Sequence, residues 1–195
     1  RTAYGEVVLA AIGRVPNTDA DWFRSSGLKL DERGYVTVDG YGRTNLDGVW
    51  ALGDITPGHA LAHRAFEQGI TIAEKIAGAD PKPVLDDTVP QVVFSFPEAA
   101  SVGLTLDQAK AREDVVEPKE TAYPMLSNAR MLMSGEGGSM TVVSGAFANN
   151  PDMQVVLGVH IVSPIASDLI AEAEQLVGNR VPLADAARLI HPHPT

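Results

Sequence analysis

A proline-rich stretch near the middle of the chain constrains its fold more than any other feature. The run Asp80-Pro81-Lys82-Pro83 is followed within a few residues by Asp86-Asp87-Thr88-Val89-Pro90. Proline fixes its own φ and disfavours helical geometry in the residue before it, so closely spaced prolines make a stiff, extended connection. We therefore predict two units, residues 1–84 and 85–195, with the boundary near residues 84–87.

Composition excludes several classes of partner and site. The 195 residues are 45% hydrophobic and carry a formal net charge of −10, without a block of Lys and Arg. Because the chain is acidic and has no basic block, we expect no nucleic acid and no anionic membrane as a partner. We also expect no membrane span, since no apolar run approaches the roughly 18 residues that a span needs. The absence of cysteine excludes disulfides and thiolate sites within this chain but identifies no compartment. His59 and His63 have helical spacing without an acidic ligand, so we expect no metal site.

The first unit is predicted to contain short strands followed by one long helix. Residues 6–12 form a continuous apolar run, which is typical of a strand buried on both faces. A helical turn at 22–28 and strands at 35–38 and within 44–54 follow. Residues 60–77 have a helical period, with one face made of Ala62, Ala65, Phe66, Gly69, Ala73 and Ile76. The small residues would let that face lie close to a sheet or a ligand, although packing alone explains them equally well.

The second unit has the pattern of an antiparallel sheet with flanking helices. The predicted strands are residues 91–96, 117–125, 140–147 and 154–162, and the predicted helices are residues 106–112, 165–177 and 183–190. Thr105 and Gln108 have the spacing of a capping box, and Asn149-Asn150-Pro151-Asp152 predicts a hairpin. In the helix at 165–177 we expect Leu169, Ala173 and Leu176 to face inward.

Gly53 and Asp54 are candidate ligand-binding residues because they follow a predicted buried strand. Ligands of α/β proteins gather at the carboxyl ends of strands, a glycine lets a ligand approach the backbone, and a carboxylate accepts hydrogen bonds from hydroxyls. The alternative is that Asp54 begins a turn or caps a helix. Gly13 likewise either admits a ligand at a strand exit or serves a turn. The helix start at residues 60–63 offers free backbone N–H groups to an anionic or carbonyl atom.

Three stretches in order, residues 11–17 (AIGRVPN), 50–54 (WALGD) and 90–105 (PQVVFSFPEAASVGLT), resemble the flavin-dependent pyridine nucleotide–disulfide oxidoreductases. The final His191-Pro192-His193-Pro194-Thr195 is most similar to that of the family's dihydrolipoamide dehydrogenases. The resemblance covers essentially the whole chain. It implies an α/β plus α+β fold: the C-terminal end of a two-dinucleotide-domain flavoprotein, followed by an antiparallel-sheet dimerisation domain with flanking helices. Residues 1–84 would be the tail of the NAD-binding domain and the central FAD-contacting domain.

The resemblance also implies roles for individual residues. Asp54 would bind the ribityl and phosphate end of FAD, and Gly13 would make a backbone contact to NAD. His193 would be the general acid/base, while His191 would shape the turn. The start of the long helix would meet the isoalloxazine carbonyl edge through backbone N–H groups of Ala60, Leu61, Ala62 and His63.

The implied reaction passes electrons from dihydrolipoamide through a disulfide and FAD to NAD. Dihydrolipoamide must lose thiol protons before sulfur can attack, because the thiolate is the nucleophile, and histidine is suited to accept such protons. The chain lacks the family's G-x-G-x-x-G and C-x-x-x-x-C motifs, and the family's Glu partner of the catalytic His would lie beyond Thr195. We therefore expect a piece of a longer enzyme that is inactive alone.

Partners follow from the same resemblance. It implies a homodimer, with the region from about Thr88 onward forming the interface and presenting His193 to the disulfide of the partner subunit. The substrate would be a lipoyl-bearing protein or a small disulfide, and the expected location is cytoplasmic. A glutathione- or mycothione-type reductase, NADP in place of NAD, and a non-catalytic dimerisation module remain open alternatives.

Overall fold

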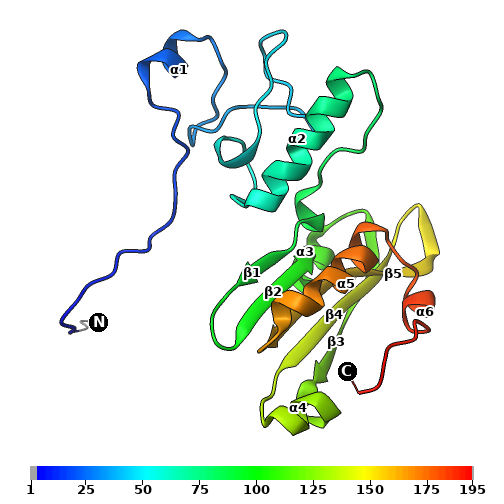
Figure 1. Ribbon diagram of the computed structural model, residues 1–195. Coiled ribbons are helices and arrows are strands. Elements are labelled where there is room, and N and C mark those ends of the chain that lie inside the picture. The colour runs from blue at the N-terminus through cyan, green and yellow to red at the C-terminus, as the bar shows by residue number, and fades with distance from the viewer. Residues whose placement is uncertain (1–3, 195) are drawn as a thin grey trace. The chain divides into compact units, whose positions relative to one another are not determined.

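The computed structural model of the chain describes residues 4–194. It divides into two compact units, Arg1–Val84 and Leu85–Thr195. Figure 1 draws the first in blue to cyan-green and the second in green to red. The prediction for Thr195, the last residue of the histidine-proline run, lies outside the described residues.

The first unit is a small core with one long helix. Its helices are α1 (Asp21–Ser25), the 3₁₀-helix η1 (Gly53–Ile55) and α2 (Ala62–Ile76). The predicted turn at 22–28 and the predicted helix at 60–77 are therefore confirmed. Phe23, Val36 and Ala51 form the buried core of this unit.

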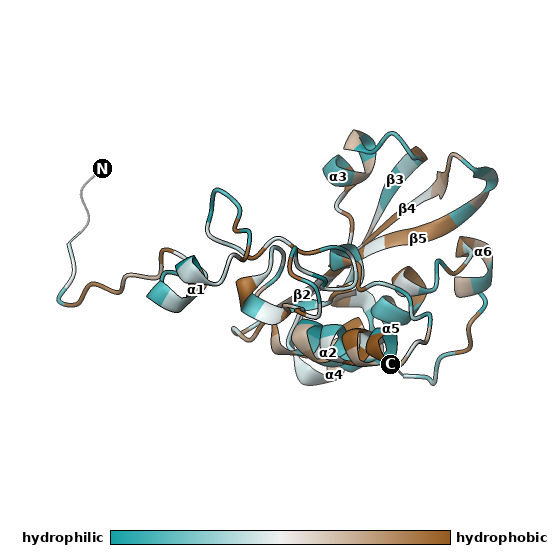
Figure 2. Ribbon diagram, turned by 90° about the horizontal axis from the view of Figure 1, so that it is seen from above, coloured by the Kyte–Doolittle hydropathy of each residue, from teal (hydrophilic) through white to brown (hydrophobic). Residues whose placement is uncertain are grey.

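The strand predicted at residues 6–12 is not present. This segment is extended but unpaired, with Val8 91% and Ile12 98% exposed. Figure 2 shows hydrophobic stretches along the extended segment that precedes α1. A strand buried on both faces needs neighbouring strands to pair with and other elements packed over both faces of the sheet. No strand pairs with this segment among the described residues. The prediction of burial is therefore wrong for this chain.

The other two strands predicted in the first unit are also absent. Each reduces to one isolated bridge: Leu30 with Val36, and Arg43 with Trp50. Turns held by aspartate side chains, which accept hydrogen bonds from nearby backbone amides, organise these loops instead. Asp31 Oδ1 accepts hydrogen bonds from two backbone amides, each 2.9 Å away, and Asp39 Oδ1 repeats the arrangement. Such turns compete with a strand ladder for the same backbone groups.

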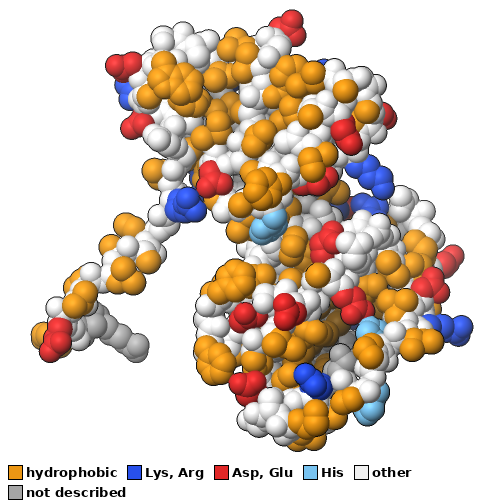
Figure 3. Space-filling view, in the orientation of Figure 1, with side chains coloured by type: hydrophobic (Ala, Val, Ile, Leu, Met, Phe, Trp, Pro, Cys, Tyr) orange, Lys and Arg blue, Asp and Glu red, His pale blue; other side chains and the backbone are white. Residues whose placement is uncertain are grey.

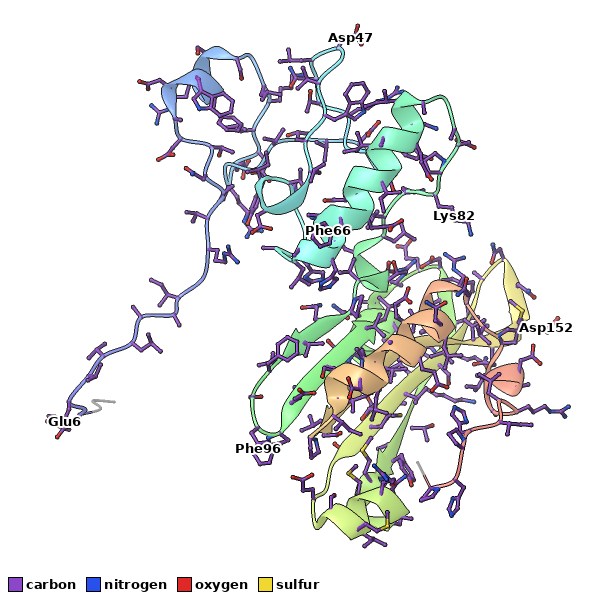
Figure 4. All side chains as sticks on the ribbon, in the orientation of Figure 1. Glu6, Asp47, Phe66, Lys82, Phe96 and Asp152 are labelled. Atoms are coloured by element: carbon purple, nitrogen blue, oxygen red, sulfur yellow. The ribbon has the colours of Figure 1, made fainter. Side chains whose placement is uncertain are left out.

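Helix α2 packs through a different face from the one predicted. Arg64, Thr71 and Ile72 are its buried residues, whereas Phe66, labelled in Figure 4, is 73% exposed. The helical period fixes which residues share a face, but the neighbouring loops decide which face is covered. Those loops offer backbone polar groups, so they select the face that carries Arg64 and Gln68.

The second unit is built on a five-stranded antiparallel sheet in the order β1-β2-β5-β4-β3. The strands are β1 (Gln91–Val93), β2 (Glu98–Gly103), β3 (Val115–Pro124), β4 (Ser139–Phe147) and β5 (Asn150–Ser163). The helices are η2 (Asp86–Thr88), α3 (Leu106–Ala111), η3 (Met125–Ser127), α4 (Ala129–Ser134), α5 (Ala166–Gly178) and α6 (Leu183–Ala186).

Most predictions for the second unit are confirmed. Strands β4 and β5 form the predicted hairpin, and both capping-box bonds between Thr105 and Gln108 are present. Strand β2 and helix α4 were not predicted. Strand β1 is shorter than predicted, because a turn follows it in which Ser95 Oγ donates to Pro97 O at 2.7 Å. Helix α6 ends at Ala186 rather than residue 190.

Helix α5 covers one face of this sheet. Its buried residues Ala166, Ile170, Ala173 and Val177 pack with side chains of β2 and β5. Leu169 and Leu176 pack, partly buried, against the same core, so the predicted inward-facing set is confirmed. A second cluster, which includes Ala109 of α3, forms separately. Strand β5 contributes Val155 and Leu157 to this second cluster, and Val156, Val159 and Ile161 to the core under α5. Strict alternation of side chains is interrupted where the register of β5 against β4 shifts between Val156 and Gly158.

Candidate functional site

Asp54 lies in the single turn of η1, immediately after Gly53. Its side chain is 49% exposed, and its Oδ2 atom lies 3.3 Å from a guanidinium nitrogen of Arg14. Gly53 has φ +73°, a left-handed conformation that favours glycine. The carboxylate therefore stands at a glycine turn and faces outward, where it can accept hydrogen bonds.

Two side chains of α2 hold the loop that carries Asp54. Gln68 Oε1 accepts a hydrogen bond from the Gly53 amide at 2.8 Å. The buried Arg64 donates to Thr56 Oγ1 at 3.4 Å and to the Pro57 carbonyl. Thr56 Oγ1 in turn donates to Gly53 O at 2.8 Å. Because Gly53 is held on both its N–H and its C=O, the backbone beside Asp54 is fixed.

Our sequence reasoning missed Arg64 and Gln68. They are four residues apart, so they share one helix face. The polar pair at 64 and 68 was the only available signal. The pair was overlooked because apolar residues ordinarily mark the buried side of a helix, and those of α2 lie mainly on the other face.

Helix α2 starts close to the position predicted from the sequence. The helix begins at Ala62 with Leu61 as its N-cap, so residues 60–63 form the helix entrance. The Ala62 backbone amide meets no acceptor among the residues that the structure describes. An open amide at a helix entrance can donate to an electronegative ligand atom.

Gly13 lies in the extended, exposed segment of the first unit. Its φ is +114°, and a Cβ built on it would meet nothing within 4 Å. The structure brings the next residue, Arg14, to Asp54, which connects this segment with the η1 loop.

The histidine-proline tail follows α6 in the second unit. His191 Nε2 lies 2.6 Å from Glu172 Oε1 of α5, and His191 Nδ1 lies 3.1 Å from the Leu189 carbonyl. The hydrogen bond to Glu172, with the attraction of its charge, raises the pKa of His191 above its ordinary value. His193 is exposed and has no hydrogen bond or ion pair with any residue from 4 to 194.

A cavity of about 740 Å³ lies beside this tail. Apolar side chains of β4, β5 and α5 form its floor together with others from η3, α4 and α6, and Glu172, His191, Pro192 and Pro194 also border it. Figure 3 shows hydrophobic and histidine side chains together on this surface of the second unit. The tail is therefore one wall of the cavity.

Neither a metal cluster nor a membrane span is found over residues 4–194. No three His, Asp or Glu side chains in that range gather closely enough to hold an ion. No helix there combines the length and the apolarity that crossing a bilayer requires.

Two family profiles match the chain. The one described as pyridine nucleotide-disulphide oxidoreductase, dimerisation domain, matches residues 89–195, and the one described as pyridine nucleotide-disulphide oxidoreductase matches residues 1–69. Among curated relatives, the dihydrolipoyl dehydrogenase of Cupriavidus necator is 40% identical over 96% of this chain and 38% of its own length. That of Geobacillus stearothermophilus is 39% identical over 100% of this chain and 40% of its own length.

Solved structures share the fold. LpdA from Mycobacterium tuberculosis superposes with a TM-score of 0.82 and 32% identity, over 95% of this chain and 39% of that one. The HOCl-induced flavoprotein disulfide reductase RclA from Escherichia coli gives a TM-score of 0.78 at 24% identity, over 95% of this chain and 41% of that one, a likeness in fold alone. The chain thus spans about two fifths of the length of the proteins it matches.

Proposed function

The chain belongs to the pyridine nucleotide-disulphide oxidoreductase family, and we propose that it is the C-terminal portion of an FAD-dependent dihydrolipoamide dehydrogenase. The observation that carries the proposal is the 39–40% identity to dihydrolipoyl dehydrogenases along nearly the entire chain. In this proposal residues 1–84 are the tail of the NAD-binding domain and the FAD-contacting domain, and residues 85–195 are the dimerisation domain.

The η1 loop and the start of α2 would hold FAD, which supplies two-electron redox chemistry when bound. The fit is supported by the outward carboxylate of Asp54, the missing Cβ of Gly53 and the open Ala62 amide. Asp54 would accept hydrogen bonds from hydroxyls of the ribityl and phosphate end. Residues 60–63 would orient the isoalloxazine carbonyl edge through backbone N–H groups.

Gly13 would provide a backbone contact to NAD. Its exposed position and the open space around it are compatible with close approach of a ligand. Arg14, paired with Asp54, would keep this segment beside the flavin-binding loop.

His193 would be the general acid/base of the disulfide chemistry. An imidazole nitrogen of His193 would take a proton from a dihydrolipoamide thiol, which leaves the thiolate that attacks a disulfide. The absence of a partner for His193 among the described residues leaves the ring available for this proton. The substrate would be a lipoyl-bearing protein or a small disulfide, in a cytoplasmic homodimer whose partner subunit supplies the disulfide.

The test uses the full-length parent. The purified parent should be yellow from bound flavin and should reduce NAD with dihydrolipoamide. The His193→Gln variant should lose most of that rate while keeping the flavin spectrum. A general base contributes roughly 10²–10⁴-fold, which sets the expected loss. Unchanged turnover in His193→Gln would refute the assigned role, and turnover with glutathione disulfide but not dihydrolipoamide would favour the sister reductases.

A dimerisation role for the isolated chain is the second candidate. The match of residues 89–195 to a dimerisation domain favours it. Size-exclusion chromatography with light scattering should give twice the 20.6 kDa chain mass at micromolar concentration. A monomer would count against the interface assignment.

A further inference from the structure

We propose that Glu172 is a positioning residue that holds the His193-bearing tail against α5 through His191. The contact joins the middle of α5, which packs on the sheet through its other face, to the tail that follows α6 and makes few other contacts. The catalytic meaning of this inference rests on the proposed function, but the contact itself can be tested without activity.

The tail depends on this contact because little else fixes it. The last backbone hydrogen bond of α6 and its extension is that of the Leu189 amide to Ala186 O. Beyond it, Ile190 is 99% exposed. From residue 190 to residue 194, as far as the structure describes the tail, His191 alone forms hydrogen bonds.

Both atoms that the His191 ring contacts are acceptors. The Leu189 carbonyl can only accept at Nδ1, and the Glu172 carboxylate accepts at Nε2. A neutral imidazole has one N–H donor, whereas the imidazolium has two. Only the protonated ring can donate to both acceptors at once, and its pairing with Glu172 is then charge-assisted.

Among residues 4–194, Glu172 is the charged group in contact with this ring. The charged residues along the same cavity are Glu172 of α5, Arg130 of α4, and Glu136 in the turn after α4. On the tail's own side, Asp185 and Arg188 precede His191. Of these, the described contacts of His191 include Glu172 alone.

Two prolines carry the effect of this contact to His193. Pro192 and Pro194 stand on either side of it, and each proline ring fixes its own φ near −65°. With His191 held on α5, fewer conformations of the tail remain, and His193 is confined to a smaller region. An exposed ion pair adds little to global stability, so its effect is expected in tail order rather than in overall unfolding.

The first experiment follows the histidine rings of the 195-residue chain by NMR. In Glu172→Gln the titration midpoint of His191 should move to lower pH, and the ¹⁵N heteronuclear NOE at residues 191 and 193 should fall. Asp168→Asn, which removes a charge one turn earlier on the same helix, should leave both unchanged. Glu172→Asp, which keeps the carboxylate, should restore part of the midpoint shift.

The second experiment measures turnover in the full-length parent. Glu172→Gln should lower kcat about tenfold with flavin content intact, a loss within the range caused by misplacing a reacting group. If Glu172→Gln and Asp168→Asn give the same His191 midpoint and the same tail order, the proposal is overturned. Turnover that is insensitive to His193→Gln would overturn the proposed function instead, so the two ideas fail on different measurements.

Discussion

Glu98 of β2 accepts a hydrogen bond at Oε2 from the Ser167 backbone amide, 2.8 Å away, at the start of α5. The N-cap residue of α5, Ile165, provides no side-chain bond of its own. A strand residue that precedes Ser167 by 69 positions therefore takes over the capping role. A negative charge at a helix N-terminus is further favoured by the helix dipole.

Replacing Glu98 with Ala should destabilise the second unit in a pH-dependent way. The Ser167 backbone bond, followed by a side-chain bond from the same residue, lowers the pKa of Glu98. A lowered folded-state pKa contributes stability above the unfolded value, and that contribution is lost as pH falls through the folded value. The urea midpoint of the wild type should exceed that of Glu98→Ala at pH 7, and the gap should close below about pH 4. An equal gap at both pH values, or the same loss in the exposed Glu113→Ala, would contradict this.

Replacing Gly158 with Ala should be among the most damaging changes in the sheet. A Cβ at Gly158 would lie 2.1 Å from the Leu104 carbonyl oxygen, and a backbone atom cannot move aside cheaply. Overpacking of this kind costs about 3 kcal/mol or more of unfolding free energy. Gly178→Ala is the control, because its nearest neighbour is a flexible Glu174 carboxylate. Chemical denaturation of both variants checks the prediction, which fails if they unfold alike.

Much of the second unit could be predicted because its signals are local. The capping box at Thr105 and the hairpin between β4 and β5 each lie within a few residues. In the first unit, the apolar run at residues 6–12 predicted a buried strand, but the segment is exposed and no strand lies beside it in the described chain. A pattern reports the environment a segment suits, and it cannot report whether that environment is present.

The candidate site likewise contains some residues that local sequence signals indicate and others that they do not. Asp54 and the helix entrance at Ala62 could be found from the Gly53-Asp54 pair and a helical period, although the strand predicted before Gly53 is only an isolated bridge. Gln68 and Glu172 could not, because their partners lie 15 and 19 residues away and the distance is closed only by tertiary packing.

Replacing Gln68 with Leu should loosen the loop that carries Asp54. The change leaves the buried Gly53 amide without its acceptor, and an unsatisfied buried donor costs about 1–3 kcal/mol. Unfolding of the first unit should become easier, and the full-length parent should lose FAD faster on dilution. Gln68→Glu keeps an acceptor oxygen and should retain most of the stability. The same substitution at the exposed neighbour, Glu67→Leu, should have little effect, and comparable losses from Glu67→Leu and Gln68→Leu would remove the case for the contact.

Replacing Thr105 with Ala should lower the free energy of unfolding by about 1 kcal/mol, the usual effect of losing an N-cap side chain. Thr105 Oγ1 accepts from the Gln108 amide, and Gln108 Oε1 accepts from the Thr105 amide. Thr105→Ser keeps the hydroxyl and should be close to wild type. A urea titration of the three proteins decides, since similar losses in the Ala and Ser variants would point to the methyl group rather than the cap.

The order of the tail should depend on pH through His191. Because Glu172 raises the pKa of His191 in the folded state, the stabilising contact is fully present below the unfolded pKa of about 6.5 and is lost as pH rises through the folded value. The ¹⁵N heteronuclear NOE at His193 should therefore be higher at pH 6 than at pH 9 in the wild type. In Glu172→Gln the ring has lost its anionic acceptor, so the same measurement should change little between those values. A pH dependence of equal size in both proteins would mean that the tail responds to another group, and a flat wild-type profile would mean that protonation of His191 does not hold it.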